Sequence, residues 1–184
     1  MRKLTSILFL LMLFALGAIA QSIDLKTNTF KITIAPNGQL LEMTDLASGK
    51  NYLASGEKAP LLKIRTGEKW EEPSNAAFNA KTGIISLNYS ESKISAEIKV
   101  ASSKTHLSFR LTKLSGNAKA DAVYWGPYPT TIGQTVGEVI GVVRDGQYAI
   151  GLQALNPKTI GGILKREGGT DDSRGNTAIA QPYG

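Results

Sequence analysis

The chain has 184 residues, of which 42% are hydrophobic and 20% charged, and this composition is that of one ordinary globular domain. The formal charge of +6 falls to +4 when Arg2 and Lys3 are set aside with the first twenty residues, and the remaining lysines are scattered singly, which argues against nucleic-acid binding. There is no cysteine and only one histidine, His106, which excludes disulfide bonds and a Cys/His zinc site, so we expect no metal and no cofactor.

Residues 1–20 have the features of a secretory signal peptide. A basic start precedes the apolar run Leu4 to Leu16, and Ala18-Ile19-Ala20 matches the small-x-small cleavage pattern. The apolar run is shorter than the roughly 20 residues of a membrane span, although an uncleaved anchor helix is the alternative. We therefore predict a secreted or periplasmic protein without membrane contact after cleavage and, lacking cysteine, without a lipid anchor.

Short alternating runs then predict half-buried strands. The first two, Thr29 to Ile34 and Leu40 to Met43, flank Asn37-Gly38, a strong hairpin signal. A turn from Asp45 to Lys50 leads to a third alternating run, Leu61 to Arg65. These elements predict an antiparallel β-meander.

The alternation is clearest between residues 84 and 114. Strands are predicted at Ile84 to Tyr89, Ile94 to Val100 and Thr105 to Leu114, each with one apolar and one polar face. His106 falls on the polar face, which indicates a solvated surface histidine. Because no ten-residue stretch shows helical periodicity, residues 21–156 are predicted to form one all-β antiparallel sandwich.

The stretch Val123 to Asn156 differs from this meander. Its beginning, VYWGPYP, gathers three aromatic residues with glycine and proline, and it is interpreted as a shaped loop that presents flat rings. Asp145-Gly146 predicts a two-residue type I′ hairpin turn. The arms of this hairpin, residues 137–144 and 147–155, are almost continuously apolar, so we expect them to be buried on both faces.

Residues 157–184 are rich in glycine and aspartate, and their periodicity fades. No closing strand is recognised in them, although antiparallel sheets normally protect their last edge. We therefore expect the sandwich to be incomplete at its C-terminus and the chain to be the front part of a longer protein. A flexible tail is the alternative.

The N-terminal residues carry a resemblance to a known family. Phe30 to Ile34, Asn37-Gly38 and the segment LEMTDLASGKNYL at residues 41–53 resemble the first hairpin of a galactose-mutarotase-like β-supersandwich, and WGPYPTTIG at residues 125–133 is similar to a later part of it. This fold forms the N-terminal domain of many secreted bacterial glycoside hydrolases, and the body of aldose epimerases and some polysaccharide lyases. The resemblance implies a domain that packs on a C-terminal catalytic domain and lines its cleft.

No catalytic residue is carried over from this family. Epimerases use a histidine acid with a glutamate base, and His106 sits on the predicted polar face. Glycosidases need two carboxylates about 5 to 9.5 Å apart. A turn explains Asp145 and a solvated loop explains Asp171 and Asp172, which leaves Glu138 unpaired. We expect this chain alone not to be an enzyme.

The predicted site is a carbohydrate-binding surface formed by Trp125, Tyr128 and Glu138. Aromatic faces stack on the apolar faces of sugar rings, and the flanking prolines lower the cost of ordering a loop. The alternative is that Trp125 fills the core or docks on a following domain. Trp70 is a second candidate for a sugar-binding aromatic residue. The expected partners are a polysaccharide or oligosaccharide and a C-terminal catalytic domain. The competing hypothesis is a stand-alone glycan-binding or cell-envelope structural protein.

Overall fold

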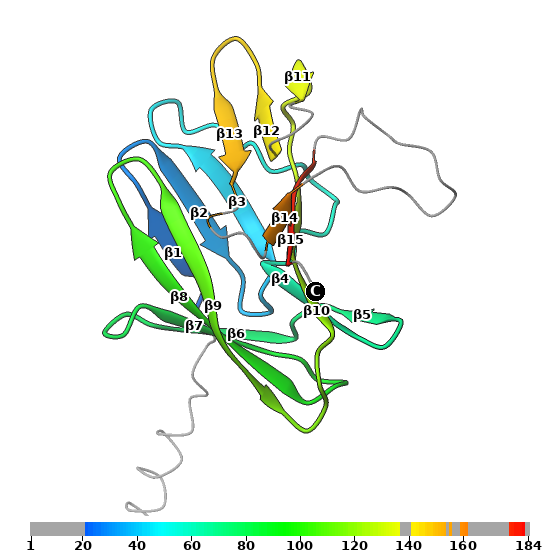
Figure 1. Ribbon diagram of the computed structural model, residues 1–184. Coiled ribbons are helices and arrows are strands. Elements are labelled where there is room, and N and C mark those ends of the chain that lie inside the picture. Colours follow the sequence, from blue (N-terminus) through cyan, green and yellow to red (C-terminus); the bar gives the residue numbers. More distant parts are fainter. Residues whose placement is uncertain (1–20, 137–140, 154, 156–158, 162–176, 183–184) are drawn as a thin grey trace, which may run out of the picture.

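The computed structural model describes residues 21–136, 141–153, 155, 159–161 and 177–182 (Figure 1). Every regular element in this part of the chain is a β-strand, and all paired strands run antiparallel. The predicted all-β, sandwich-like class is confirmed. No helix of the described residues is long and apolar enough to cross a membrane.

The strands form four sheets. The first has the order β1 (Ile23–Lys26), β2 (Phe30–Ile34), β3 (Leu40–Asp45). The second has the order β6 (Asn75–Asn79), β7 (Ile84–Asn88), β8 (Ile94–Ser102), β9 (Leu107–Gly116). The third has the order β14 (Thr159–Gly161), β15 (Thr177–Pro182), β10 (Ala122–Pro129), β4 (Leu62–Thr66), β5 (Lys69–Glu71). The fourth has the order β11 (Thr135–Val136), β12 (Gly141–Arg144), β13 (Ala149–Leu152).

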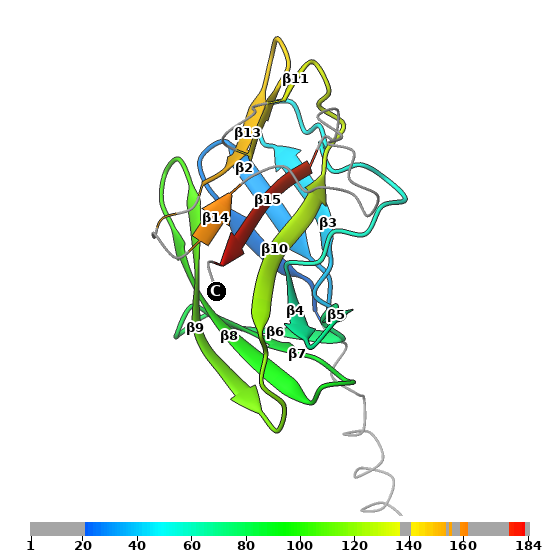
Figure 2. The same cartoon turned by 45° about the vertical axis from the view of Figure 1, so that its right-hand side comes forward.

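The sheet β6-β7-β8-β9 curves around one side and the lower end of the molecule, and the sheets that contain β2 and β10 lie across from it (Figures 1 and 2). One apolar core joins these three sheets. Its fully enclosed members, each 0% exposed, are Ile34, Leu62, Ile64, Ile85, Leu87, Ala96 and Ile98. A smaller cluster, in which Tyr52 and Tyr148 stack at 4.7 Å between ring centroids, holds the β12–β13 hairpin.

Alternation accounts for most of these strands. In β8 the side chains of Ile94, Ala96, Ile98 and Val100 are buried while the residues between them are half-buried or exposed, as predicted. Strands β1, β5 and β6 are among those that were not predicted. The sequence of β6, NAAFN, has little β-propensity, and its five residues become a strand by pairing along the whole of β7.

Both early turns are confirmed. Gly38 has φ +80° in the β2–β3 hairpin, and a Cβ at this position would lie 2.6 Å from Pro73 Cγ, so the site requires glycine. The Asp45 carboxylate accepts hydrogen bonds from the amides of Ala47 and Ser48 and from the Ser48 hydroxyl. These bonds hold the pKa of the Asp45 carboxyl below its usual value.

The interpretation of VYWGPYP as a loop is wrong, because these residues form most of β10. Residues 122–125 pair with β4, and Trp125, Tyr128 and Pro129 pair with β15. Pro127 is tolerated because it lies at the register shift between Trp125 and Tyr128, where the ladder with β15 is interrupted. Non-local pairing thus converts a proline-containing aromatic segment into a central strand.

The hairpin around Asp145 is confirmed, but two details of its prediction are wrong. The pairs Arg144–Ala149 and Asp145–Tyr148 centre the turn on Gly146-Gln147, and Gly146 does not have the positive φ of a type I′ turn. The Asp145 carboxylate instead accepts the amides of Gln147 and Tyr148. In β13, Ala149 is exposed and Ile150 half-buried, so this arm is not buried on both faces. Residues 137–140 of the other arm lie outside the described residues.

The expectation that no closing strand follows residue 156 is also wrong. Thr177–Pro182 forms β15, which lies between β14 and β10. Its sequence, TAIAQP, was too short and weakly patterned to predict a strand. The ladder of the third sheet therefore extends beyond the expected domain boundary.

Candidate functional site

Tyr128, one of the three predicted site residues, is enclosed in the core. It is 8% exposed, and its hydroxyl donates a hydrogen bond of 2.6 Å to the carbonyl of Leu61. Burial raises the pKa of this hydroxyl. Tyr89 makes the matching bond from the β7–β8 turn, donating to the Leu62 carbonyl at 2.9 Å. The two phenols therefore tie β10 and the second sheet to the start of β4.

Trp125 is half-buried and also packs against the core. It pairs with Leu62 across β10 and β4, and its ring centroid lies 6.2 Å from that of Phe109 on β9. This position matches the alternative that Trp125 is a packing residue. Glu138 lies outside the described residues. The structure therefore does not place Trp125 and Tyr128 together on an open surface, and the carbohydrate-binding roles of all three residues stay a prediction.

Alternation along β10 separates its aromatic residues. Val123 and Trp125 pack against the core, whereas Tyr124 between them points to the opposite, outer face of the third sheet, where it is itself buried, at 2% exposed. The sequence did contain this signal, since a strand that begins with a buried Val123 must turn Tyr124 away from Trp125. The alternation is visible only when the segment is treated as a strand and not as a loop.

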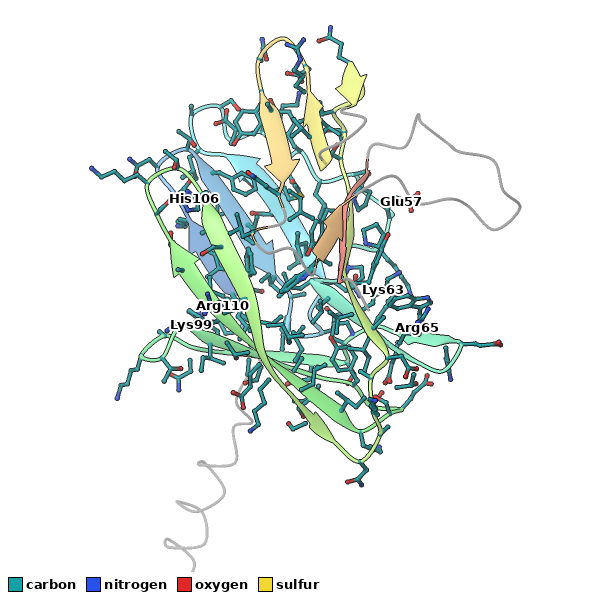
Figure 3. The ribbon with its side chains drawn as sticks, in the orientation of Figure 1. Glu57, Lys63, Arg65, Lys99, His106 and Arg110 are labelled. Atoms are coloured by element: carbon teal, nitrogen blue, oxygen red, sulfur yellow. The ribbon has the colours of Figure 1, made fainter. Side chains whose placement is uncertain are left out.

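Three side chains gather around Tyr124 on this outer face, and we call Lys63, Arg65, Trp70 and Tyr124 the outer-face cluster. Strand register assembles it, because Lys63 is paired with Tyr124 and Arg65 with Trp70. The ring centroids of Trp70 and Tyr124 lie 5.6 Å apart with planes inclined at 60°. Figure 3 shows Lys63 and Arg65 side by side at β4, far from Arg110 of β9.

The two cations of the cluster contact its rings. Lys63 Nζ lies 4.8 Å from the ring centroid of Tyr124 and 5.7 Å from that of Trp70. Arg65 Cζ lies 5.6 Å from the Trp70 centroid. These distances are those of cation–π contacts. Trp70 is nevertheless 40% exposed, so part of its indole remains open to a ligand.

Two polar atoms of the cluster are buried without a hydrogen-bond partner among the described residues. They are the Tyr124 hydroxyl oxygen and Arg65 Nε. Buried polar atoms are nearly always paired in proteins, so two unpaired ones in the same cluster call for an explanation. Burial raises the pKa of Tyr124, which keeps its hydroxyl protonated and able to donate.

The cluster is electropositive and poorly compensated. Among the described residues, no carboxylate lies within ion-pair distance of Lys63 or Arg65. Burial lowers the pKa of the Lys63 ammonium, and nearby Glu72 opposes this shift while Lys58 adds to it. The Glu72 carboxylate is itself engaged by Lys58 at 3.0 Å and by the amide of Gln39 at 3.2 Å.

Other parts of the described surface offer less chemistry. His106 is exposed beside the hydroxyls of Ser103 and Thr105, so the prediction of a surface histidine is confirmed. The described residues contain no group of three His, Cys, Asp or Glu that could hold a metal ion. A surface depression of about 350 Å³ lies at the end of β9, and it is lined by Ile94, Leu114, Ser115, Gly116, Asn117, Ala118, Lys119 and Ala120. Without an aromatic ring, that depression is a weaker candidate than the outer-face cluster.

The outer-face cluster therefore offers groups that can bind a ligand. It combines a partly open indole with three hydrogen-bond donors, the phenol, the guanidinium and the ammonium. It contains no carboxylate or histidine to act as an acid or base. No family model, no curated protein and no solved structure matches this chain, so the resemblance to galactose-mutarotase-like domains remains a prediction from the residues.

Proposed function

We propose that this chain is an exported, carbohydrate-associated β-sandwich that holds sugar at the outer-face cluster. In this proposal it is the non-catalytic N-terminal domain of a polysaccharide-degrading glycoside hydrolase, where it packs on the catalytic domain and lines its cleft. The signal-peptide pattern of residues 1–20 supports export. The aromatic rings and cations that contact one another in the cluster support a binding role.

The observation that carries the proposal is the partly open Trp70 beside Tyr124. Carbohydrate sites combine an aromatic platform for the apolar face of a sugar with a few polar groups for its hydroxyls. Trp70 supplies the platform, and the Tyr124 hydroxyl and Arg65 Nε are buried donors that lack a partner in the described chain. Trp125 and Tyr128, in contrast, have their rings against the core.

The experiment compares Trp70→Ala with the native chain lacking residues 1–20. Affinity electrophoresis through gels that contain a panel of neutral and acidic polysaccharides measures retention. We expect at least one polysaccharide to retain the native protein and Trp70→Ala to lose about tenfold in affinity. Because Trp70 is partly exposed, its removal should lower the melting temperature by only a few degrees, on the order of 1 kcal/mol.

Phe78→Ala is the matched control. Phe78 is an aromatic residue of similar exposure, 37%, but it lies on β6 at the edge of the second sheet. Its replacement should leave retention unchanged. The proposal fails if no polysaccharide retains the native protein, or if Trp70→Ala and Phe78→Ala are retained as strongly as the native protein.

A further inference from the structure

We propose that the outer-face cluster selects acidic glycans, with Arg65 and Lys63 holding a carboxylate or sulfate group of a sugar whose ring lies against Trp70. This inference rests on the proposed function, because it specifies which sugars the same surface takes. Three independent features of the cluster lead to it.

The first feature is that the two cations of the cluster lack the ion pairs that some lysines make elsewhere on the molecule. Two lysines of the other sheets face a glutamate on the neighbouring strand, Lys31 facing Glu42 at 2.5 Å and Lys113 facing Glu97 at 3.5 Å. On the outer face of β4, two cations lie two residues apart on the same side of the strand without such a partner. This face therefore has a local excess of positive charge that the fold does not use.

The second feature is the state of Arg65. Its Nε is buried without a hydrogen-bond partner in the described chain, while its main-chain carbonyl is occupied by the amide of Asp121. A guanidinium offers a planar fork of N–H donors that matches the two oxygens of a carboxylate or sulfate. The neutral hydroxyl groups of a sugar would form weaker hydrogen bonds with these N–H donors than an anion would.

The third feature is the environment of Lys63. Burial between the sheet and the rings of Trp70 and Tyr124 lowers its pKa, which means that its positive charge is held at a cost. An anion bound beside the ammonium would relieve this cost. The Tyr124 hydroxyl is an additional donor in the same place.

A second group of cations offers a comparison on the same molecule. Arg110 and Lys99 are paired across β9 and β8, and both are exposed. No aromatic ring of the described residues contacts them, and Lys99 donates instead to the carbonyl of Thr82 at 2.5 Å. Figure 3 shows them far from Lys63 and Arg65. Replacing Arg110 therefore removes the same charge as replacing Arg65 without touching the cluster.

The test uses matched polysaccharides that differ only in the anionic group. Polygalacturonate is compared with its methyl ester, which tests a carboxylate, and carrageenan with the same carrageenan after desulfation, which tests a sulfate. We expect at least one acidic member to retain the native chain about tenfold more strongly than its neutral counterpart, and retention to weaken as salt is added. The pair that shows the difference identifies the anionic group.

Variants assign the effect to residues. Arg65→Ala should lower affinity for the acidic glycan about tenfold, Arg65→Lys should lower it less because the charge remains, and Arg110→Ala should change it less than about twofold. Circular dichroism verifies that each variant is folded, and Arg65→Lys provides the test if Arg65→Ala does not fold.

The remaining outcomes separate this inference from the proposed function. If acidic and neutral members are retained equally and Trp70→Ala abolishes both, the inference is overturned while sugar binding stands. If Arg110→Ala weakens retention as much as Arg65→Ala does, the attraction is unspecific and the inference is overturned. Retention by no polysaccharide removes both proposals.

Discussion

The two faces of the β4–β10 strand pair are built from the same residue types but use them differently. On the inner face, Trp125 packs on Phe109, and the Tyr128 hydroxyl donates to a main-chain carbonyl. On the outer face, Trp70 is partly exposed, and the Tyr124 hydroxyl has no partner in the described chain. An aromatic residue whose polar atom is hydrogen-bonded within the protein stabilises the fold. One whose polar atom has no partner within the protein can still form a hydrogen bond with a ligand.

This difference predicts that inner-face substitutions act on stability and outer-face substitutions on binding. Tyr128 provides the largest expected effect. Tyr128→Ala should lower the free energy of unfolding by about 3–5 kcal/mol, because it removes a buried ring from the core. Tyr128→Phe should cost about 1 kcal/mol, the value of one buried hydrogen bond to the Leu61 carbonyl. Urea-induced unfolding measures both changes.

Tyr89→Phe serves as the control for the hydroxyl, since Tyr89 makes the equivalent bond to the Leu62 carbonyl. The two Phe variants should lose similar stability and keep full glycan retention. If Tyr128→Ala were as stable as the native protein and lost retention, the assignment of this ring to the core would be wrong.

Trp125→Ala is expected to have the next largest effect. The half-buried indole contacts Phe109 and the core, so its removal should cost about 2–3 kcal/mol, less than a fully enclosed aromatic residue would. Glycan retention measured below the melting temperature should not change. Lost retention at unchanged stability would return Trp125 to the sugar site and break the distinction between the two faces.

Lys63→Met should have the smallest effect on stability, within about 0.5 kcal/mol, because the residue is partly exposed and its charge is not ion-paired. The pH dependence of the free energy of unfolding is more informative about Lys63. With its pKa lowered by burial, Lys63 loses its proton at lower pH in the folded than in the unfolded protein. The stability of the native protein should therefore rise slightly as pH approaches the ordinary lysine value, because the unfolded chain then binds more protons.

Thermal unfolding at neutral and alkaline pH, compared between the native protein and Lys63→Met, measures this rise. The variant should lack it. A loss of more than about 1 kcal/mol in Lys63→Met at neutral pH would mean that the ammonium holds the fold together, and the outer face would then resemble the inner one.

Local patterns were sufficient where the interactions are local. The Asn37-Gly38 turn, the Asp45 turn and the strand from Ile94 to Val100 follow from backbone preference, side-chain capping and period-two burial within a few residues. Local patterns did not predict the strand formed by VYWGPYP. There, pairing with β4, some sixty residues earlier in the chain, overrides the local preference of proline and glycine for a loop.

The amino-acid sequence by itself determined the all-β class, the positions of most strands and the aromatic composition of the candidate site, because each depends on residue type and short-range spacing. Only the tertiary structure decided which aromatic residues lie on the inner face of the third sheet and which lie on its outer face. Strand register set that outcome, since it places Trp125 opposite Leu62 and Tyr124 opposite Lys63. A shift of one residue in this pairing would exchange the two faces.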